Sequence, residues 1–177
     1  MSNLIKNIVR FCLFILAQVY VLDQIPPLHQ LITPYIYFLF ILWLPFKMNR
    51  LMQMVLAFVL GFTLDCFTNS FGLHAASCVL IAYVRPFLIN LLISQEGVEK
   101  NYNEPSIQSL GFTPYFTYVA ILTFIHNSFL FFLEALQTGG FFYFIVKSLS
   151  STAISLLLVL LIELIFVRKQ RFRTNTA

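Results

Sequence analysis

Residues 51–93 read LMQMVLAFVLGFTLDCFTNSFGLHAASCVLIAYVRPFLINLLI, and this stretch decides the fold class. It holds two continuously apolar runs, 51–67 and 71–93, separated by a short polar turn. A helix needs about 20 apolar residues to cross the hydrocarbon core of a bilayer, and each run is close to that length. Neither run alternates polar and apolar residues as a membrane β-barrel strand does. The stretch therefore predicts two consecutive transmembrane helices.

The composition of the whole chain agrees with a membrane protein. Among its 177 residues, 59% are hydrophobic, 10% are charged and 21 are Phe. An ordinary soluble domain has roughly 25% charged residues, and a small one buries only about two-thirds of its surface. The composition therefore argues against a soluble enzyme, a disordered tail and a secreted disulfide scaffold. The three cysteines Cys12, Cys66 and Cys78 lie in apolar runs without a C-x-x-C pair, which is typical of packing residues.

Extending the same reading along the chain predicts one all-α domain, 1–177, with six transmembrane helices. The expected spans are 4–22, 27–46, 51–67, 71–93, 112–136 and 141–167. A polar loop, 94–111, separates the fourth span from the fifth, and a basic tail, 168–177, follows the sixth. No small-x-small cleavage site follows the first apolar run, so we expect a retained anchor helix and not a signal peptide.

The distribution of Lys and Arg predicts the orientation, because cytoplasmic loops carry an excess of these residues. With six spans, both termini, the loop after the second span and the polar loop share one side. That side collects Lys6, Arg10, Lys47, Arg50, Lys100, Arg168, Lys169, Arg171 and Arg173. The opposite loops contain neither Lys nor Arg. We therefore expect cytoplasmic termini, and we attribute the net charge of +4 to the membrane and not to nucleic acid.

Ionisable residues within spans are energetically costly, so each is a candidate for function. Asp65 lies near the outer end of the third span, between Gly61 and Gly72. It is interpreted either as a contact for a partner or neighbouring helix, or as a boundary residue that helps the chain turn between two spans. The two glycines favour close helix approach around it.

Other charged residues are expected to form structural ion pairs. Arg85 precedes Pro86, and it either extends to the cytoplasmic surface along its own stem or pairs with Glu163. Glu134 and Lys147 lie near the outer ends of adjoining helices and can pair in the same way.

His126 lies in the middle of the fifth span, and we expect it to form a hydrogen bond between helices. It shares a helix face with Glu134, but one His and one Glu are too few for a metal site. The chain has no G-x-S-x-G, H-E-x-x-H, Walker or dinucleotide-binding motif. We therefore expect no metal, no cofactor and no enzymatic activity. A small membrane enzyme that acts on lipid or isoprenoid is a further alternative, and the absence of paired catalytic residues argues against it.

The stretch from Pro34 to Pro86 resembles the rod shape-determining protein MreD family. The resemblance rests on Pro34, Leu44-Pro45, the basic loop with Lys47 and Arg50, and AFVLGFTLDCFTNSFGLHAASCVLIAYVRP (57–86). The family signature is a Gly, an Asp four residues later, a short turn and then Gly before an apolar residue. Gly61, Asp65, Gly72 and Leu73 fit it, and the later IHNSFLFFLEA (125–135) is similar to the Bacteroidetes version.

This resemblance implies a non-enzymatic scaffold of the bacterial inner membrane. MreD proteins partner the single-span protein MreC within the elongation machinery. That machinery links MreB filaments to a SEDS glycosyltransferase and a transpeptidase that build the lateral wall. The implied fold is similar to the six-helix substrate-binding subunits of energy-coupling-factor transporters. We also expect that copies of this chain can associate with one another.

A substrate-binding subunit of such a vitamin transporter is therefore the alternative function. Those subunits resemble one another in an Ala-x-x-x-Ala face on the first helix, which docks to the coupling partner. The first span here has only Ala17, with no small residue four positions away. The scaffold interpretation is therefore favoured.

Overall fold

The computed structural model describes residues 3–24, 32–70, 72–92, 102–138 and 141–165. Several predicted features lie outside these residues: positions 27–31 of the second span, 94–101 of the polar loop, and the basic tail 168–177. The described residues form helices and connecting segments, with no strand among them. The all-α prediction is therefore confirmed for this part of the chain.

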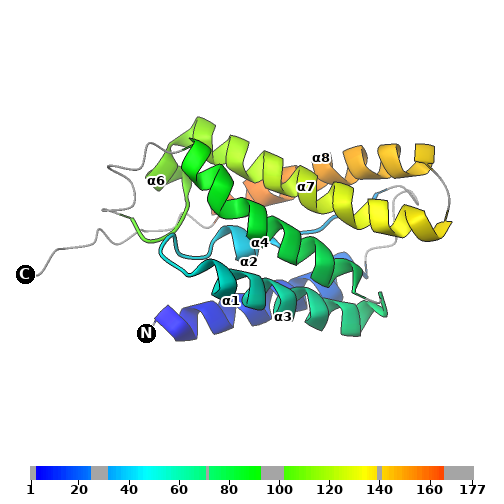
Figure 1. Cartoon of the computed structure of the whole chain (residues 1–177), viewed down its shortest axis with the longest axis horizontal. Coiled ribbons are helices and arrows are strands. Elements are labelled where there is room, and N and C mark those ends of the chain that lie inside the picture. Colours follow the sequence, from blue (N-terminus) through cyan, green and yellow to red (C-terminus); the bar gives the residue numbers. More distant parts are fainter. Residues whose placement is uncertain (1–2, 25–31, 71, 93–101, 139–140, 166–177) are drawn as a thin grey trace, which may run out of the picture.

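Four helices are long and apolar enough to cross a membrane. They are α3 (Arg50–Thr68), α4 (Leu73–Leu92), α7 (Phe112–Thr138) and α8 (Phe141–Ile165). Their positions match the predicted third to sixth spans. Helix α4 packs against both α3 and α7, and α8 packs along α7 (Figure 1).

The first predicted span is helical throughout its described part, and its last turn is a π-helix. Helix α1 (Asn3–Ala17) continues directly into one π-helical turn, η1 (Gln18–Leu22). Its apolar part, Asn7–Leu22, is shorter than the four long helices. Helix α1 begins and α8 ends at the same end of the bundle, where α3 also begins (Figure 1). We call this end the Arg50 end, and the opposite end, where α3 turns into α4, the Asp65 end.

The prediction of a regular helix over 27–46 is wrong for its described part. Residues 32–36 have no regular secondary structure, and only the single turn α2 (Leu39–Leu42) is helical. Pro34 has no amide hydrogen and disfavours a helical conformation at Thr33, which accounts for the irregular start. We call residues 32–44 the core segment.

The core segment lies at the centre of the hydrophobic core and not on its surface. Five of its side chains have a relative exposure of 0%: Tyr37, Phe38, Leu39, Ile41 and Leu42. Residues of α1 pack on it, because the Phe14 ring lies 5.4 Å from Trp43 and the Phe11 ring 5.6 Å from Phe40. Among the described residues, four helices are thus long and apolar enough to span a membrane, the apolar helix of α1 and η1 is shorter, and residues 32–44 are mostly irregular.

Side chains from α8 bond to the irregular backbone of the core segment. The amide of Thr33 donates to Ser151 Oγ at 3.1 Å, and the amide of Tyr35 donates to Ser155 Oγ at 3.0 Å. Irregular backbone is tolerated at membrane depth only where protein groups satisfy it. The hydroxyl residues of α8 therefore supply backbone partners in addition to close helix packing.

Gln18 of η1 also bonds to the backbone of the core segment. Its side-chain oxygen accepts from the amide of Ile36 at 3.0 Å, and its side-chain nitrogen donates to the carbonyl of Pro34 at 3.2 Å. The Gln18 side chain is fully buried. This residue therefore joins the end of the first helix to the core segment.

The described part of the predicted polar loop is not entirely irregular. It contains the short helix α6 (Ile107–Leu110), which begins with a capping box between Ser106 and Ser109. Before it, Glu104 accepts hydrogen bonds from Arg10 of α1 at 2.9 and 3.0 Å. The loop therefore packs onto the Arg50 end of the bundle.

Candidate functional site

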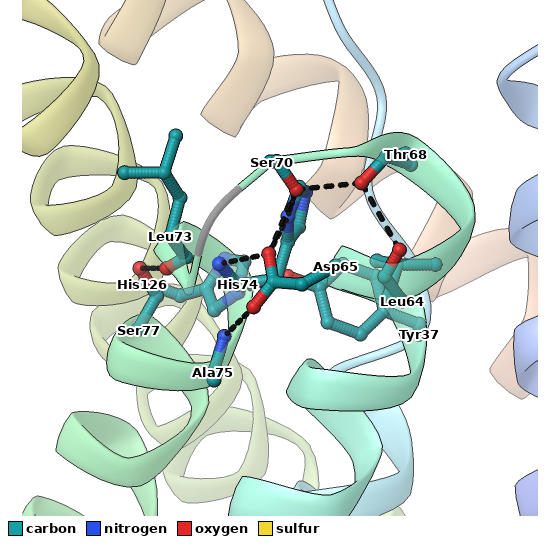
Figure 2. Close-up of polar contacts among 10 residues, drawn as sticks. All are labelled: Tyr37, Leu64, Asp65, Thr68, Ser70, Leu73, His74, Ala75, Ser77 and His126. Carbon is teal, nitrogen blue, oxygen red and sulfur yellow. Dashed lines mark hydrogen bonds and ion pairs between the residues drawn. The ribbon is translucent and has the colours of Figure 1, made fainter.

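The Asp65 carboxylate caps the first turn of the next helix. Its Oδ1 accepts from the amide of His74 at 3.1 Å, and its Oδ2 accepts from the amide of Ala75 at 3.0 Å. These amides belong to the first turn of α4, which has no partner for them within its own helix. A carboxylate at a helix N-terminus also opposes the positive end of the helix dipole. Asp65 therefore joins α3 to α4 (Figure 2).

Both glycines of the predicted motif lie at this junction, for different reasons. A Cβ atom on Gly61 would come within 2.5 Å of Ala75 Cα and the His74 carbonyl, so only glycine permits this approach of α3 and α4. Gly72 has a φ of +86°, a left-handed backbone conformation that residues other than glycine rarely adopt. The spacing of Gly61, Asp65 and Gly72 thus builds a tight helical hairpin.

Ser70 and His74 join Asp65 in a compact polar cluster. Ser70 Oγ donates to Asp65 Oδ1 at 2.7 Å, and His74 Nδ1 lies 3.0 Å from the same oxygen and 2.9 Å from Ser70 Oγ. A catalytic triad needs the serine and the carboxylate on opposite ring nitrogens of the histidine. Here both contact Nδ1 and also contact each other. The cluster has the geometry of a helix cap and not of an activated nucleophile.

His126 lies beside this cluster and contacts the core segment. Its Nε2 is 2.8 Å from Tyr37 Oη, and its ring stacks on Phe38 with centroids 4.7 Å apart. The Tyr37 ring also lies 5.6 Å from the ring of His74. Tyr37 therefore connects the predicted site residue His126 with the Asp65 cluster (Figure 2). The expected hydrogen bond of His126 exists, but it leads to the core segment and not to another long helix.

Arg85 follows neither of the two expected arrangements. Its side chain is fully buried, so it does not extend to the surface. The guanidinium donates to Tyr118 Oη at 3.0 Å, to Gln53 Oε1 at 2.9 Å and to the carbonyl of Leu44. Glu163, its other expected partner, instead accepts from Tyr115 at 3.0 Å. Arg85 thus connects α3, α4, α7 and the end of the core segment.

Glu134 and Lys147 form the ion pair that their sequence positions allowed. Lys147 Nζ lies 2.7 and 2.8 Å from the two Glu134 oxygens, joining α7 to α8 at the Asp65 end. The ammonium group also lies 4.8 Å from the ring centre of Phe131. This contact holds the ends of the last two helices together.

An apolar groove of about 1030 Å³ runs along the outside of α3 and α4. We call it the α3–α4 groove. Its lining includes Met54, Phe58 and Phe62 of α3, and Ala76, Val79 and Tyr83 of α4. Several of these side chains are about half exposed, such as Phe58 at 50% and Phe62 at 52%. Asp65 lines one end of the groove, so the capped hairpin determines its shape.

Sequence patterns did not single out several residues that complete these contacts. Gln18 and Gln53 are uncharged, and Tyr118 lies in an aromatic-rich helix, so none stood out. The pairing of His74 with Asp65 was not predicted either. The position of His74 two residues after Gly72, at the start of a predicted helix, is the signal that marks it as part of the cap.

Among the described residues, no group of three or more His, Cys, Asp or Glu is arranged to hold a metal ion. Comparison of the chain with protein-family models, with curated proteins and with solved structures finds no match.

Proposed function

We propose that this chain is a non-enzymatic scaffold of the bacterial inner membrane that binds a single-span, MreC-like partner. In this role it supports lateral peptidoglycan synthesis and cell shape. The proposal rests on the MreD-like spacing of Gly61, Asp65, Gly72 and Leu73. The three residues of that pattern at the α3–α4 junction form a rigid hairpin, and none of them has the geometry of a catalytic group.

The α3–α4 groove supports the part of the proposal that concerns a single-span partner. From Met54 to Cys66 its lining on α3 rises about 18 Å along the helix. That length covers much of a hydrocarbon core of about 30 Å. Small residues such as Gly72, Ala75 and Ala76 line the Asp65 half, and small residues let helix backbones approach closely in membranes. We place the helix of the partner in this half, against Phe62.

The wider assembly follows from the same family resemblance. A SEDS glycosyltransferase and a transpeptidase of wall elongation are proposed as direct or indirect partners, and MreB filaments as indirect ones. Self-association of the chain is compatible with this role. We also propose that both termini lie in the cytoplasm, which the distribution of Lys and Arg supports.

The test is to extract the tagged chain from its native membranes in mild detergent and to identify the co-purified proteins by mass spectrometry. We expect a single-span MreC-like protein, alone or with wall synthases. Phe62→Ala should reduce its recovery about tenfold, the effect of removing one strong contact of about 1.4 kcal/mol. Phe124→Ala is the matched control, because Phe124 is 47% exposed on α7 and does not line the groove.

Asp65→Leu is a poor test of partner binding, because it removes the cap of α4. Two outcomes contradict the proposal. Recovery of a transporter coupling subunit with ATPases would favour the substrate-binding subunit of a vitamin transporter. Equal recovery of the MreC-like partner by the Phe62→Ala and Phe124→Ala variants would exclude the groove as its binding surface.

A further inference from the structure

Arg50 borders one end of the α3–α4 groove through its contact with Tyr83, and it has no ion-pair partner among the described residues. It is the first residue of α3, and the first turn of that helix contains no acidic residue. Within the described part of the chain, no carboxylate forms an ion pair with it. Its side chain is exposed, and its position adds to the positive end of the helix dipole. The site therefore favours an anion.

The other described arginines, Arg10 and Arg85, and Lys147 of α8 are already engaged. Arg10 donates to both oxygens of Glu104, Lys147 contacts both oxygens of Glu134, and Arg85 is fully buried among three acceptors. Lys47, which is exposed three residues before Arg50, adds charge at the same end. Among the described residues, Arg50 is thus an available cation that contacts the lining of the groove.

The guanidinium of Arg50 lies over the ring of Tyr83, which lines the groove. Its Cζ lies 5.5 Å from the ring centre of Tyr83, which lines the groove and is 55% exposed. Met54 follows one helical turn later and Phe58 a further turn on, both in the lining. From Arg50 to Phe58 the helix rises about 12 Å, and one leaflet of a core of about 30 Å is about 15 Å deep.

We propose that the Arg50 half of the groove binds an anionic phospholipid. The phosphate pairs with Arg50, and one acyl chain lies along Met54, Phe58 and Val79. A positive charge at the end of an apolar groove matches a lipid with an acidic headgroup, and basic pockets between membrane helices bind such headgroups. The groove volume of about 1030 Å³ is at the upper end of ligand-site volumes, which are about 300–1,000 Å³. The inference goes beyond the scaffold role, which uses the Asp65 half of the groove.

Native mass spectrometry of the delipidated full chain in detergent tests this site. Phosphatidylglycerol and phosphatidylcholine with identical acyl chains are the probes. One basic residue near the membrane surface contributes enough for about a fivefold preference for the anionic lipid. Arg50→Gln should abolish this preference, whereas the control Arg10→Gln should keep it, because Glu104 already neutralises Arg10.

A second variant tests where the acyl chain lies. Val79→Trp fills the groove and should reduce binding of both lipids, while the preference for phosphatidylglycerol remains. Gel filtration of each variant verifies that it is folded. Equal preference in wild type and Arg50→Gln would overturn the headgroup assignment. Unchanged lipid binding by Val79→Trp, or a wild-type dimer that this variant dissociates, would overturn the acyl-chain assignment. No partner is present in this experiment, so its failure would leave the scaffold proposal unaffected.

Discussion

One carboxylate, that of Asp65, determines how α3 joins α4. It accepts hydrogen bonds from two amides of α4 and from Ser70, and it contacts His74, all at 2.7–3.1 Å. Loss of a helix cap costs about 0.5–2 kcal/mol, and each buried donor left unpaired costs about 1–3 kcal/mol. Asp65→Ala should therefore lower the free energy of unfolding by about 2 kcal/mol or more, measured by denaturant titration in detergent.

The control for this change is Thr63→Ala. Thr63 lies on the same helix, and its hydroxyl donates only to the carbonyl of Val59, one turn earlier. We expect this variant to unfold like the wild type. If Asp65→Ala is as stable as Thr63→Ala, the carboxylate does not hold the hairpin together.

The two glycines of the hairpin should respond in opposite ways to substitution. At Gly61 any side chain collides with the backbone of α4, and a larger one collides more, so Gly61→Asn should be less stable than Gly61→Ala. At Gly72 there is open space and a φ of +86°, which Asn tolerates better than Ala. Gly72→Asn should therefore be more stable than Gly72→Ala. Thermal unfolding of the four variants measures this, and the same order at both positions would contradict it.

The core segment depends on side chains from other elements for its backbone hydrogen bonds. Gln18→Leu should leave the amide of Ile36 and the carbonyl of Pro34 without their partner. Since an unpaired buried group costs about 1–3 kcal/mol, amide exchange at Thr33, Tyr35 and Ile36 should accelerate about tenfold or more. Hydrogen–deuterium exchange with mass spectrometry measures the change.

Thr117→Ala provides the comparison for this exchange experiment. Its hydroxyl donates to the carbonyl of Thr113 in its own helix, so the core segment should keep its wild-type exchange rate. Wild-type exchange in the Gln18→Leu variant would show that other contacts hold the core segment.

The end of the α7–α8 pair depends on a partly buried ion pair. Lys147 is 7% exposed, so Glu134→Gln should leave its charge poorly compensated and should destabilise the protein by about 2 kcal/mol. Adding Lys147→Met should recover part of this loss, because the uncompensated charge is then removed. A double-mutant cycle measured by unfolding in detergent gives the coupling. Additive effects of the two substitutions would show that the pair contributes nothing specific.

The arrangement of the whole chain predicts which side each terminus occupies. Helix α1 begins and α8 ends at the same end of the bundle (Figure 1). In the sequence, the predicted loops and tails of one side carry the Lys and Arg residues, and the opposite loops carry none. Fusions of a reporter that is active only in the cytoplasm should therefore be active at both the N-terminus and the C-terminus. Activity at one terminus alone would mean that the chain crosses the membrane an odd number of times.

The long helices were predictable because their signal is local. Each of α3, α4, α7 and α8 is a continuous apolar run of sufficient length, and transfer of such a run into an apolar environment depends on its own composition. The Gly61, Asp65 and Gly72 junction was also visible, since all three residues lie within 12 positions of the chain. Its detailed role as a cap was one of two interpretations that composition alone left open.

The core segment shows what the amino-acid pattern did not determine. Its residues are as apolar as those of a membrane helix, so hydropathy predicts a helix there. Its irregular backbone is stabilised by Ser151 and Ser155, which are 118 and 120 residues away from Thr33 and Tyr35. The partners of Arg85 likewise come from three separate parts of the chain. Such contacts arise only when the helices pack, so tertiary structure decides the path of residues 32–44, whereas local composition determines the long helices around them.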